Sequence, residues 1–211
     1  MSWIPFGYIF ETDIVEKLIN NFFTVPAFRN DTLPCLVEIA GLKIEDSDPK
    51  YNEYTEKQYW LFCTFVQKTV EVTKGKNLSE EHRNVTENQR PHFEVFCLQT
   101  GLLLSDFLKN QIRNVENLIV NNPNDFTNAL ETALDKALDY LIQLSNIPND
   151  ELFRVMMEFW HEFTYYIMVT MKGKDIFAKT GDKNLMNLQN DVLLKNSGIR
   201  STMFPKYCDQ L

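Results

Sequence analysis

The stretch that most constrains the fold is residues 3–42, where only the short break Thr24-Val25-Pro26 separates two apolar helical patterns. Apolar residues in each pattern recur at steps of three and four, which places them on one face of a helix. Gly41 follows the second pattern as a helix stop. Two amphipathic helices with so short a link fold back on each other as an αα-hairpin. The first face consists of Phe10, Ile14, Leu18, Ile19 and Phe22, and the second of Phe28, Leu33, Leu36, Val37 and Ala40.

The same kind of pattern continues along the chain and predicts an all-α protein. Four further amphipathic helices are expected after the first hairpin, and no stretch alternates as a β-strand does. Polar segments at 43–53, 73–90 and 172–200 lack apolar periodicity and are expected to be loops. The expected helices span 13–23, 27–42, 54–72, 91–118, 125–145 and 149–171.

A second proline break, Ile147-Pro148-Asn149, repeats the first one and indicates a repeated architecture. Four expected helices lie between the two breaks, which gives about 61 residues per helix pair. HEAT and armadillo units need about 40 to 47 residues, and the polar loops account for the excess. We therefore expect a HEAT/armadillo-like α-solenoid of antiparallel helix pairs, as one repeat segment over 1–211. The pairs are expected at 1–23, 26–72, 91–145 and 149–211; a closed helical bundle is the alternative.

Both ends of the chain carry apolar residues with little polar cover. Residues 1–10 crowd Trp, Ile, Phe and Tyr together, and residues 201–211 begin an apolar pattern that stops at Leu211. Such patches are normally covered by a neighbour, so we expect a segment cut from a longer array. Within the hairpin, Pro34 predicts either a kink or a helix whose regular part begins at Asp31 or Thr32.

The overall composition argues against several classes of function. A net charge of −8 and a pI of about 5.0 are unlike the basic surplus of proteins that bind nucleic acids directly. No apolar run approaches the roughly 20 residues of a membrane span, and the start has no signal-peptide pattern. The four cysteines are far apart and form no C-x-x-C pair, which favours buried free thiols.

No motif for catalysis, a cofactor or a metal is found in the sequence. His82, His92 and His161 are far apart, with His82 in an expected loop, and no phosphate-binding or nucleophile motif occurs. The aromatic residues, 13% of the chain, fall at helical spacings that indicate core packing. One row of carboxylates recurs at steps of four on the expected helix 125–145, and such a row is most often a solvated face. The row is Glu131, Asp135 and Asp139.

Three blocks near the start of the chain resemble a known family. The order WIP-x-GYIFE, VP-x-FRN and CL-x-EIAG, at 3–11, 25–30 and 35–41, is similar to the exportins that recognise leucine-rich nuclear export signals. These exportins belong to the karyopherin (importin-β) superfamily. Weaker similarity continues at 59–69, 102–110, 129–145 and 152–162. The resemblance covers most of this chain but only a small part of an exportin, which is several times longer.

The resemblance implies a transport receptor and not an enzyme, with no cofactor. Family members bind export-signal cargo together with Ran-GTP, contact nucleoporins, and shuttle between nucleus and cytoplasm. The resemblance makes 13–23, 54–72 and 125–145 inner helices, and 27–42, 91–118 and 149–171 outer ones. Glu131, Asp135 and Asp139 would then face the concave side and Ran.

The family's groove for export signals, and the reactive cysteine in it, lie further toward the C-terminus than these residues reach. None of Cys35, Cys63, Cys97 and Cys208 corresponds to that cysteine. Two other functions stay open on the sequence: a helical-repeat scaffold with unrelated partners, and a small all-α enzyme whose site has no recognisable motif. Neighbouring repeats would favour export, and polar groups converging in a closed pocket would favour an enzyme.

Overall fold

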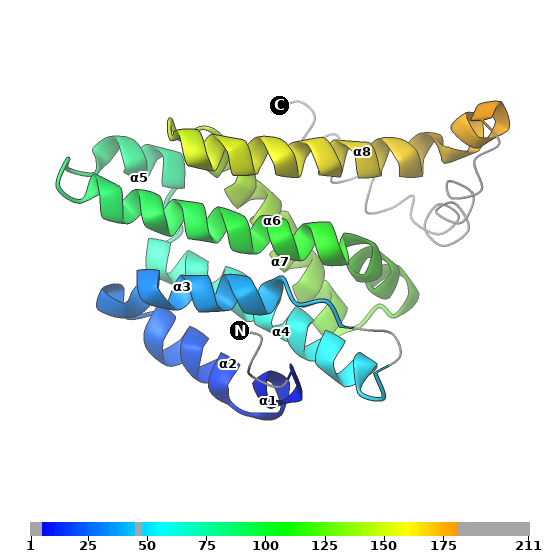
Figure 1. Cartoon of the computed structure of the whole chain (residues 1–211), viewed down its shortest axis with the longest axis horizontal. Coiled ribbons are helices and arrows are strands. Elements are labelled where there is room, and N and C mark those ends of the chain that lie inside the picture. Colours follow the sequence, from blue (N-terminus) through cyan, green and yellow to red (C-terminus); the bar gives the residue numbers. More distant parts are fainter. Residues whose placement is uncertain (1–5, 45–47, 181–211) are drawn as a thin grey trace.

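The computed structural model describes residues 6–44 and 48–180, and every regular element in those ranges is a helix (Figure 1). The elements are α1 (Phe6–Glu11), α2 (Ile14–Lys17), the π-helical turn η1 (Leu18–Phe23), α3 (Pro26–Ala40), α4 (Tyr51–Thr73), α5 (Leu78–Asn84), α6 (Arg90–Asn121), α7 (Asp125–Ser145) and α8 (Asp150–Thr180). The all-α prediction is confirmed.

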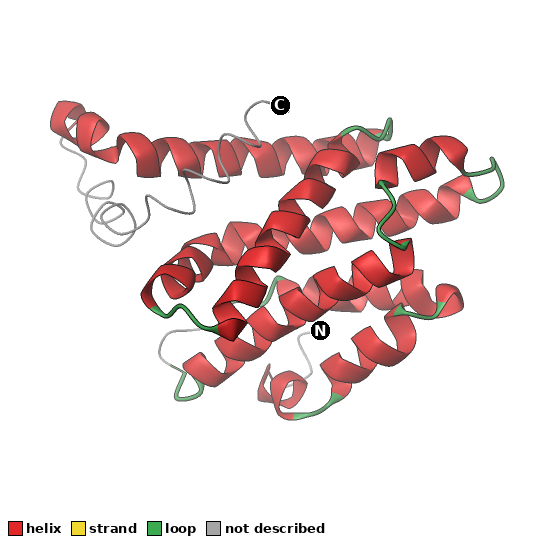
Figure 2. Ribbon diagram, turned by 180° about the vertical axis from the view of Figure 1, so that it is seen from behind, coloured by secondary structure: helices red, strands yellow, loops and turns green. Residues whose placement is uncertain are grey.

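The long helices form two layers. Helices α3, α6 and α8 lie side by side in the first layer, and α2 with η1, α4 and α7 form the second (Figures 1 and 2). Each connection crosses from one layer to the other, so consecutive long helices are antiparallel. Successive helices within a layer cover each other's apolar faces, which is the arrangement of an α-solenoid. The predicted HEAT-like fold class is confirmed.

Large side chains fill the space between the layers. The rings of Phe62 on α4 and Phe107 on α6 stack with centroids 4.0 Å apart, and both are fully buried. Phe23 of η1 packs on Phe65 of α4 with centroids 5.1 Å apart. Rings of this size remove much apolar surface from water, and the flat stack adds a favourable aromatic contact. One core therefore runs from η1 to α8.

A chain of buried amides crosses this core between α4 and α6. The Gln111 amide nitrogen donates to the Gln58 side-chain oxygen at 3.3 Å, and Gln58 donates to the backbone oxygen of Leu42 at 2.8 Å. The hydroxyl of Tyr59 donates to Gln111 at 3.5 Å. Gln58 and Gln111 are both buried. Since a buried amide without a partner is costly, these bonds make the pairing of α4 with α6 specific.

The predicted apolar face of the first helix is partly wrong. Ile14 and Phe22 are exposed, while Val15, Ile19 and Phe23 are buried. The break at 12–13 separates α1 from α2, and the helix then continues as the π-helical η1. A π turn closes its hydrogen bonds over one more residue than an α turn, which rotates the following side chains around the axis. The inward aromatic is therefore Phe23 and not Phe22.

The second helix of the hairpin does not begin at Asp31 or Thr32, which was one of the two alternatives for Pro34. Helix α3 starts at Pro26 in the first turn and continues through Pro34 to Ala40. Its expected inward residue Phe28 is exposed and instead packs edge-on against Phe22, with ring centroids 6.0 Å apart. Leu33 and Leu36 are fully buried as expected.

Two of the expected loops are also corrected. The segment 73–90 contains α5, which begins at the cap residue Asn77, whose side chain accepts from the backbone nitrogens of Ser79 and Glu80. Helix α8 continues to Thr180, past the expected end at 171 and through Gly173. The rest of the loop expected at 172–200, and the apolar pattern at 201–211, lie outside the described residues.

Candidate functional site

The carboxylate row singled out from the sequence lies along one edge of α7. The buried stripe of this helix, with Leu130, Leu134 and Leu138, faces the core. Glu131, Asp135 and Asp139 are each half-buried beside that stripe, and the centre of the solvent face carries other residues. Asp135 and Asp139 each already interact with another group of the protein. The row is therefore partly built into the fold, and it is less open than a fully solvated face would be.

The first layer contains a more distinctive feature, the seam between α6 and α8. At one end of this seam the two helices approach closely at Gly101. A Cβ placed on Gly101 would lie 3.0 Å from Met156 Cε and 3.2 Å from Leu152 Cδ1. The helices are thus close-packed here: a single methyl would have to displace the flexible ends of these side chains slightly, and a larger side chain would push against α8.

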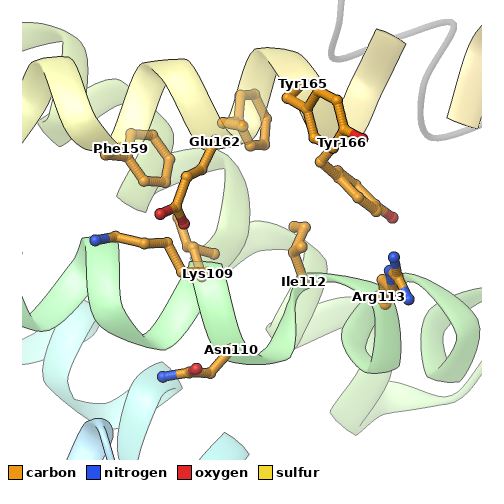
Figure 3. Close-up of a pocket in the computed structure, with 10 residues that line it drawn as sticks. Lys109, Asn110, Ile112, Arg113, Phe159, Glu162, Tyr165 and Tyr166 are labelled. Atoms are coloured by element: carbon orange, nitrogen blue, oxygen red, sulfur yellow. The ribbon is translucent and has the colours of Figure 1, made fainter. Parts of the chain in front are cut away.

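Further along the same seam the helices enclose a groove of about 440 Å³ (Figure 3). We call it the α6–α8 groove. Aromatic rings come from α8, and positively charged side chains from α6. Figure 3 shows Glu162 extending from α8 toward Lys109, and Tyr166 extending toward Arg113. The groove is lined by Leu108, Lys109, Asn110, Ile112, Arg113, Phe159, Glu162, Phe163, Tyr165 and Tyr166.

Charged groups bridge the two helices of the groove at Lys109. Lys109 Nζ lies 3.0 Å from Glu158 Oε1 across the seam and 3.7 Å from Asp106 Oδ1 on its own helix. Burial opposes the charge on Lys109, but the hydrogen bond and the negative charge of Glu158 outweigh it, so its pKa is raised. Burial also raises the pKa of Asp106, and Lys109 only partly offsets that effect. Three carboxylates, with Glu162 as the third, thus share one lysine.

A hydrogen bond and an aromatic contact join the two helices further along the groove, at Tyr166. The hydroxyl of Tyr166 donates to Glu116 Oε2 at 2.5 Å, and the Arg113 guanidinium lies over the Tyr166 ring at 6.0 Å from its centroid. The neighbouring Tyr165 stays exposed at 58% of its surface. Exposed aromatic rings beside charged side chains are typical of protein contact surfaces, where rings supply area and charges supply specificity.

The three histidines do not come together. His82 lies on α5 and not in a loop, and it is buried with Nε2 2.8 Å from Glu94 Oε1. The other oxygen of Glu94 accepts from the Asn149 side chain at 3.1 Å, and Asn149 caps α8 by accepting from the Leu152 backbone nitrogen. Glu94 therefore links α5, α6 and the start of α8. The cap signal at Asn77, followed by Leu78 and His82 four residues apart, could have revealed this helix.

None of the helices described is both long enough and apolar enough to cross a membrane. No set of three or more His, Cys, Asp or Glu side chains in the described part of the chain is placed to hold a metal ion.

Comparison with known proteins identifies the relatives of this chain. Residues 132–167, which include the row's Asp135 and Asp139 and much of α8, match the family described as the chromosome region maintenance or exportin repeat. Exportin-1 of Schizosaccharomyces pombe is 32% identical over 172 residues, 82% of this chain and 14% of that protein. Exportin-1 of Drosophila melanogaster is 33% identical over 161 residues, 76% of this chain and 13% of that protein.

A plant relative extends the match to nearly the whole chain. The protein EXPORTIN 1A of Arabidopsis thaliana is 30% identical over 189 residues, 90% of this chain and 16% of that protein. The chain thus spans about one seventh of the length of the curated relatives it matches. Similarity at this level in three kingdoms, together with the two-layer helical array, agrees with the resemblance noted at 3–11, 25–30 and 35–41. The chain belongs to the exportin-1 family.

Proposed function

We propose that this chain serves as part of a nuclear export receptor, which carries cargo with leucine-rich signals out of the nucleus together with Ran-GTP. The observation that carries the proposal is the match to proteins named exportin-1 over 76–90% of the chain. The solenoid fold supports it, since each helix pair touches only its neighbours and small changes in twist add up along such an array. Binding, and not catalysis, is the role proposed for this segment.

The segment's proposed contribution is to form part of the arch that holds Ran-GTP and cargo together. In such a receptor each ligand raises the affinity for the other, and the coupling is reciprocal. Contacts with nucleoporins and movement between nucleus and cytoplasm belong to the same proposal. The exposed rings along the first layer, among them Tyr165, are suited to weak contacts with protein partners.

Within this function we propose that the carboxylate row on α7 faces the concave side and contributes to Ran-GTP binding. The test is the triple variant Glu131→Lys, Asp135→Lys, Asp139→Lys in the intact receptor. Reversing three charges at a contact is expected to weaken Ran-GTP binding about tenfold or more, with a strong dependence on salt. The dissociation constant is measured by fluorescence titration with Ran-GTP.

The matched control reverses three exposed carboxylates elsewhere, Glu38→Lys, Glu80→Lys and Glu87→Lys, and should leave Ran-GTP affinity unchanged. Because Asp135 and Asp139 have partners inside the protein, the single variant Glu131→Lys accompanies the triple one. Circular dichroism establishes that each variant is folded. Equal affinity of the folded triple variant and the natural receptor would contradict the role of the row.

A further inference from the structure

Arg29 on α3 is a partly buried cation that has no acidic partner among the described residues. Its Nε donates to the backbone oxygen of Phe23 at 3.0 Å, and its Nη2 donates to that of Thr24 at 3.3 Å. The guanidinium also lies between two rings, 5.9 Å from the centroid of Phe23 and 5.8 Å from that of Phe96. Among the described residues no carboxylate lies within ion-pair distance of it.

The charge of Arg29 is therefore stabilised only in part. Burial lowers the pKa of its guanidinium, and no neighbouring carboxylate opposes that effect. Two neutral carbonyls and two aromatic faces offset a portion of the lost hydration. An arginine offers five N–H donors in a planar fork, and carbonyls occupy only two of them here. The site thus retains both donor capacity and uncompensated positive charge.

Arg29 lines a pocket of about 370 Å³ at the end of the molecule where α3 and α6 begin, beside α5 (Figure 1). Lys74 and Lys76 also line this pocket, whereas Glu81 is its one acidic lining residue and pairs with Lys76 at 2.8 Å. Lys74 is exposed on the left-handed end of α4, with φ 55°, and no carboxylate of the described residues pairs with it. A positive pocket is a local exception in a chain whose net charge is −8.

The rest of the lining is apolar or neutral. Rings of Phe93 and Phe96 and the side chains of Val72, Leu78 and Val85 form the walls, while Asn30, Thr73, Gln89 and His92 add polar groups. A small free anion would leave the partly exposed Val72, Val85 and Phe93 in contact with water. A ligand that brings a carboxylate and an apolar side chain together satisfies both halves of the pocket.

We propose that this pocket binds an acidic segment of a partner protein, with a carboxylate on Arg29 and Lys74 and a neighbouring apolar side chain against Phe93. The pocket lies apart from the carboxylate row on α7, and its surface has the opposite sign. This site is thus separate from the proposed Ran-GTP contact, and either proposal can fail without the other.

The test uses the whole 211-residue chain and a short fluorescein-labelled peptide rich in Asp and Glu that carries one Phe and one Leu. Its counterpart has Asn and Gln in place of the acids. Fluorescence anisotropy is expected to show binding of the acidic peptide only, weakening as salt is added. The variant Lys74→Glu, Lys76→Glu should lower the affinity about tenfold or more. The bound peptide should also shift the Nε–H resonance of Arg29.

The matched control is Lys43→Glu, Lys136→Glu, which makes the same change in net charge at exposed lysines outside the pocket. It should change the affinity less than about twofold. Equal binding of the amide peptide, or an equal loss in the control variant, would overturn the proposal. Displacement of the peptide by millimolar inorganic phosphate or by a short oligonucleotide would overturn it too, in favour of a free phosphate or a nucleic acid.

Discussion

Helix α6 meets α4 across a sealed interface and α8 across a seam that is only partly closed. Toward α4 it presents Phe107, stacked flat on Phe62, and the buried amide of Gln111. Toward α8 it is close-packed at Gly101 and then opens into the α6–α8 groove, where charged and aromatic side chains line the space between the helices. The difference teaches that one helix can secure the fold with one face and form a contact surface with another.

The largest expected change in stability tests the interface between α6 and α4. Phe107→Ala should lower the free energy of unfolding by about 3–5 kcal/mol, because it leaves a cavity beside Phe62. Urea unfolding followed by circular dichroism measures the change. Phe153→Ala is the matched control, since Phe153 is exposed at 57% of its surface and should cost less than about 0.5 kcal/mol. Similar losses in the two variants would remove the contrast between the interfaces.

The next effect concerns the close-packed end of the seam. Gly101→Val should lower the free energy of unfolding by about 1–3 kcal/mol, because its methyl groups have no room against Met156 and Leu152. Gly101→Ala is the control: one methyl displaces the flexible end of Met156, and the better helix propensity of Ala, about 1 kcal/mol, offsets much of the strain. A valine variant as stable as the alanine variant would show that the seam is loose along its whole length.

A smaller change in stability is expected at Tyr166, in the α6–α8 groove. Tyr166→Phe removes the hydrogen bond to Glu116 and should lower the free energy of unfolding by about 1–2 kcal/mol. The adjacent Tyr165→Phe makes the same chemical change on an exposed ring and should have almost no effect. Thermal unfolding of both variants gives the comparison. If Tyr165→Phe proved the more costly, the assignment of the closing contact to Tyr166 would be wrong.

The smallest effect is a dependence on pH. Burial raises the folded-state pKa of Asp106 above its ordinary value of 3.8, so the folded chain holds this proton more tightly than the unfolded chain. Protonated Asp106 therefore favours the folded chain at low pH. This contribution is lost as the pH rises from the unfolded-state pKa through the higher folded-state pKa. Asp106→Asn should remove this loss and make the chain slightly more stable at neutral pH. Urea midpoints between about pH 4 and pH 7 test it, with the exposed Asp31→Asn as control.

Sequence patterns predicted the long helices because each buries one continuous apolar stripe. The sequence pattern of α7 predicts an apolar stripe, of which six residues are buried, Phe126 is half-buried and Ala129 is exposed; the six are Leu130, Ala133, Leu134, Ala137, Leu138 and Leu141. The errors lie where backbone geometry departs from the regular α-helix. The π turn η1 brings Phe23 inward in place of Phe22, and neither residue type signals that turn. Helix α5 is too short for periodicity and is revealed only by its cap at Asn77.

The binding surfaces were less predictable than the fold. The carboxylate row appears directly in the sequence as a period of four, although its partial burial does not. The α6–α8 groove joins Lys109 with Glu158, and Glu116 with Tyr166, which lie on helices about 50 residues apart in sequence. Such pairs depend on how far each helix is displaced along its neighbour. The side-chain period within one helix carries no information about that displacement.

The amide chain between Gln58 and Gln111 limits how this array can deform. Sliding α6 along α4 by one helical turn would break the bond from Gln111 to Gln58 inside the core, and the donor and the acceptor left unpaired would each cost about 1–3 kcal/mol. Tilting the helices about the same contact keeps both hydrogen bonds. At this pair the helices can therefore tilt more easily than they can slip, which keeps α6 in register with α4.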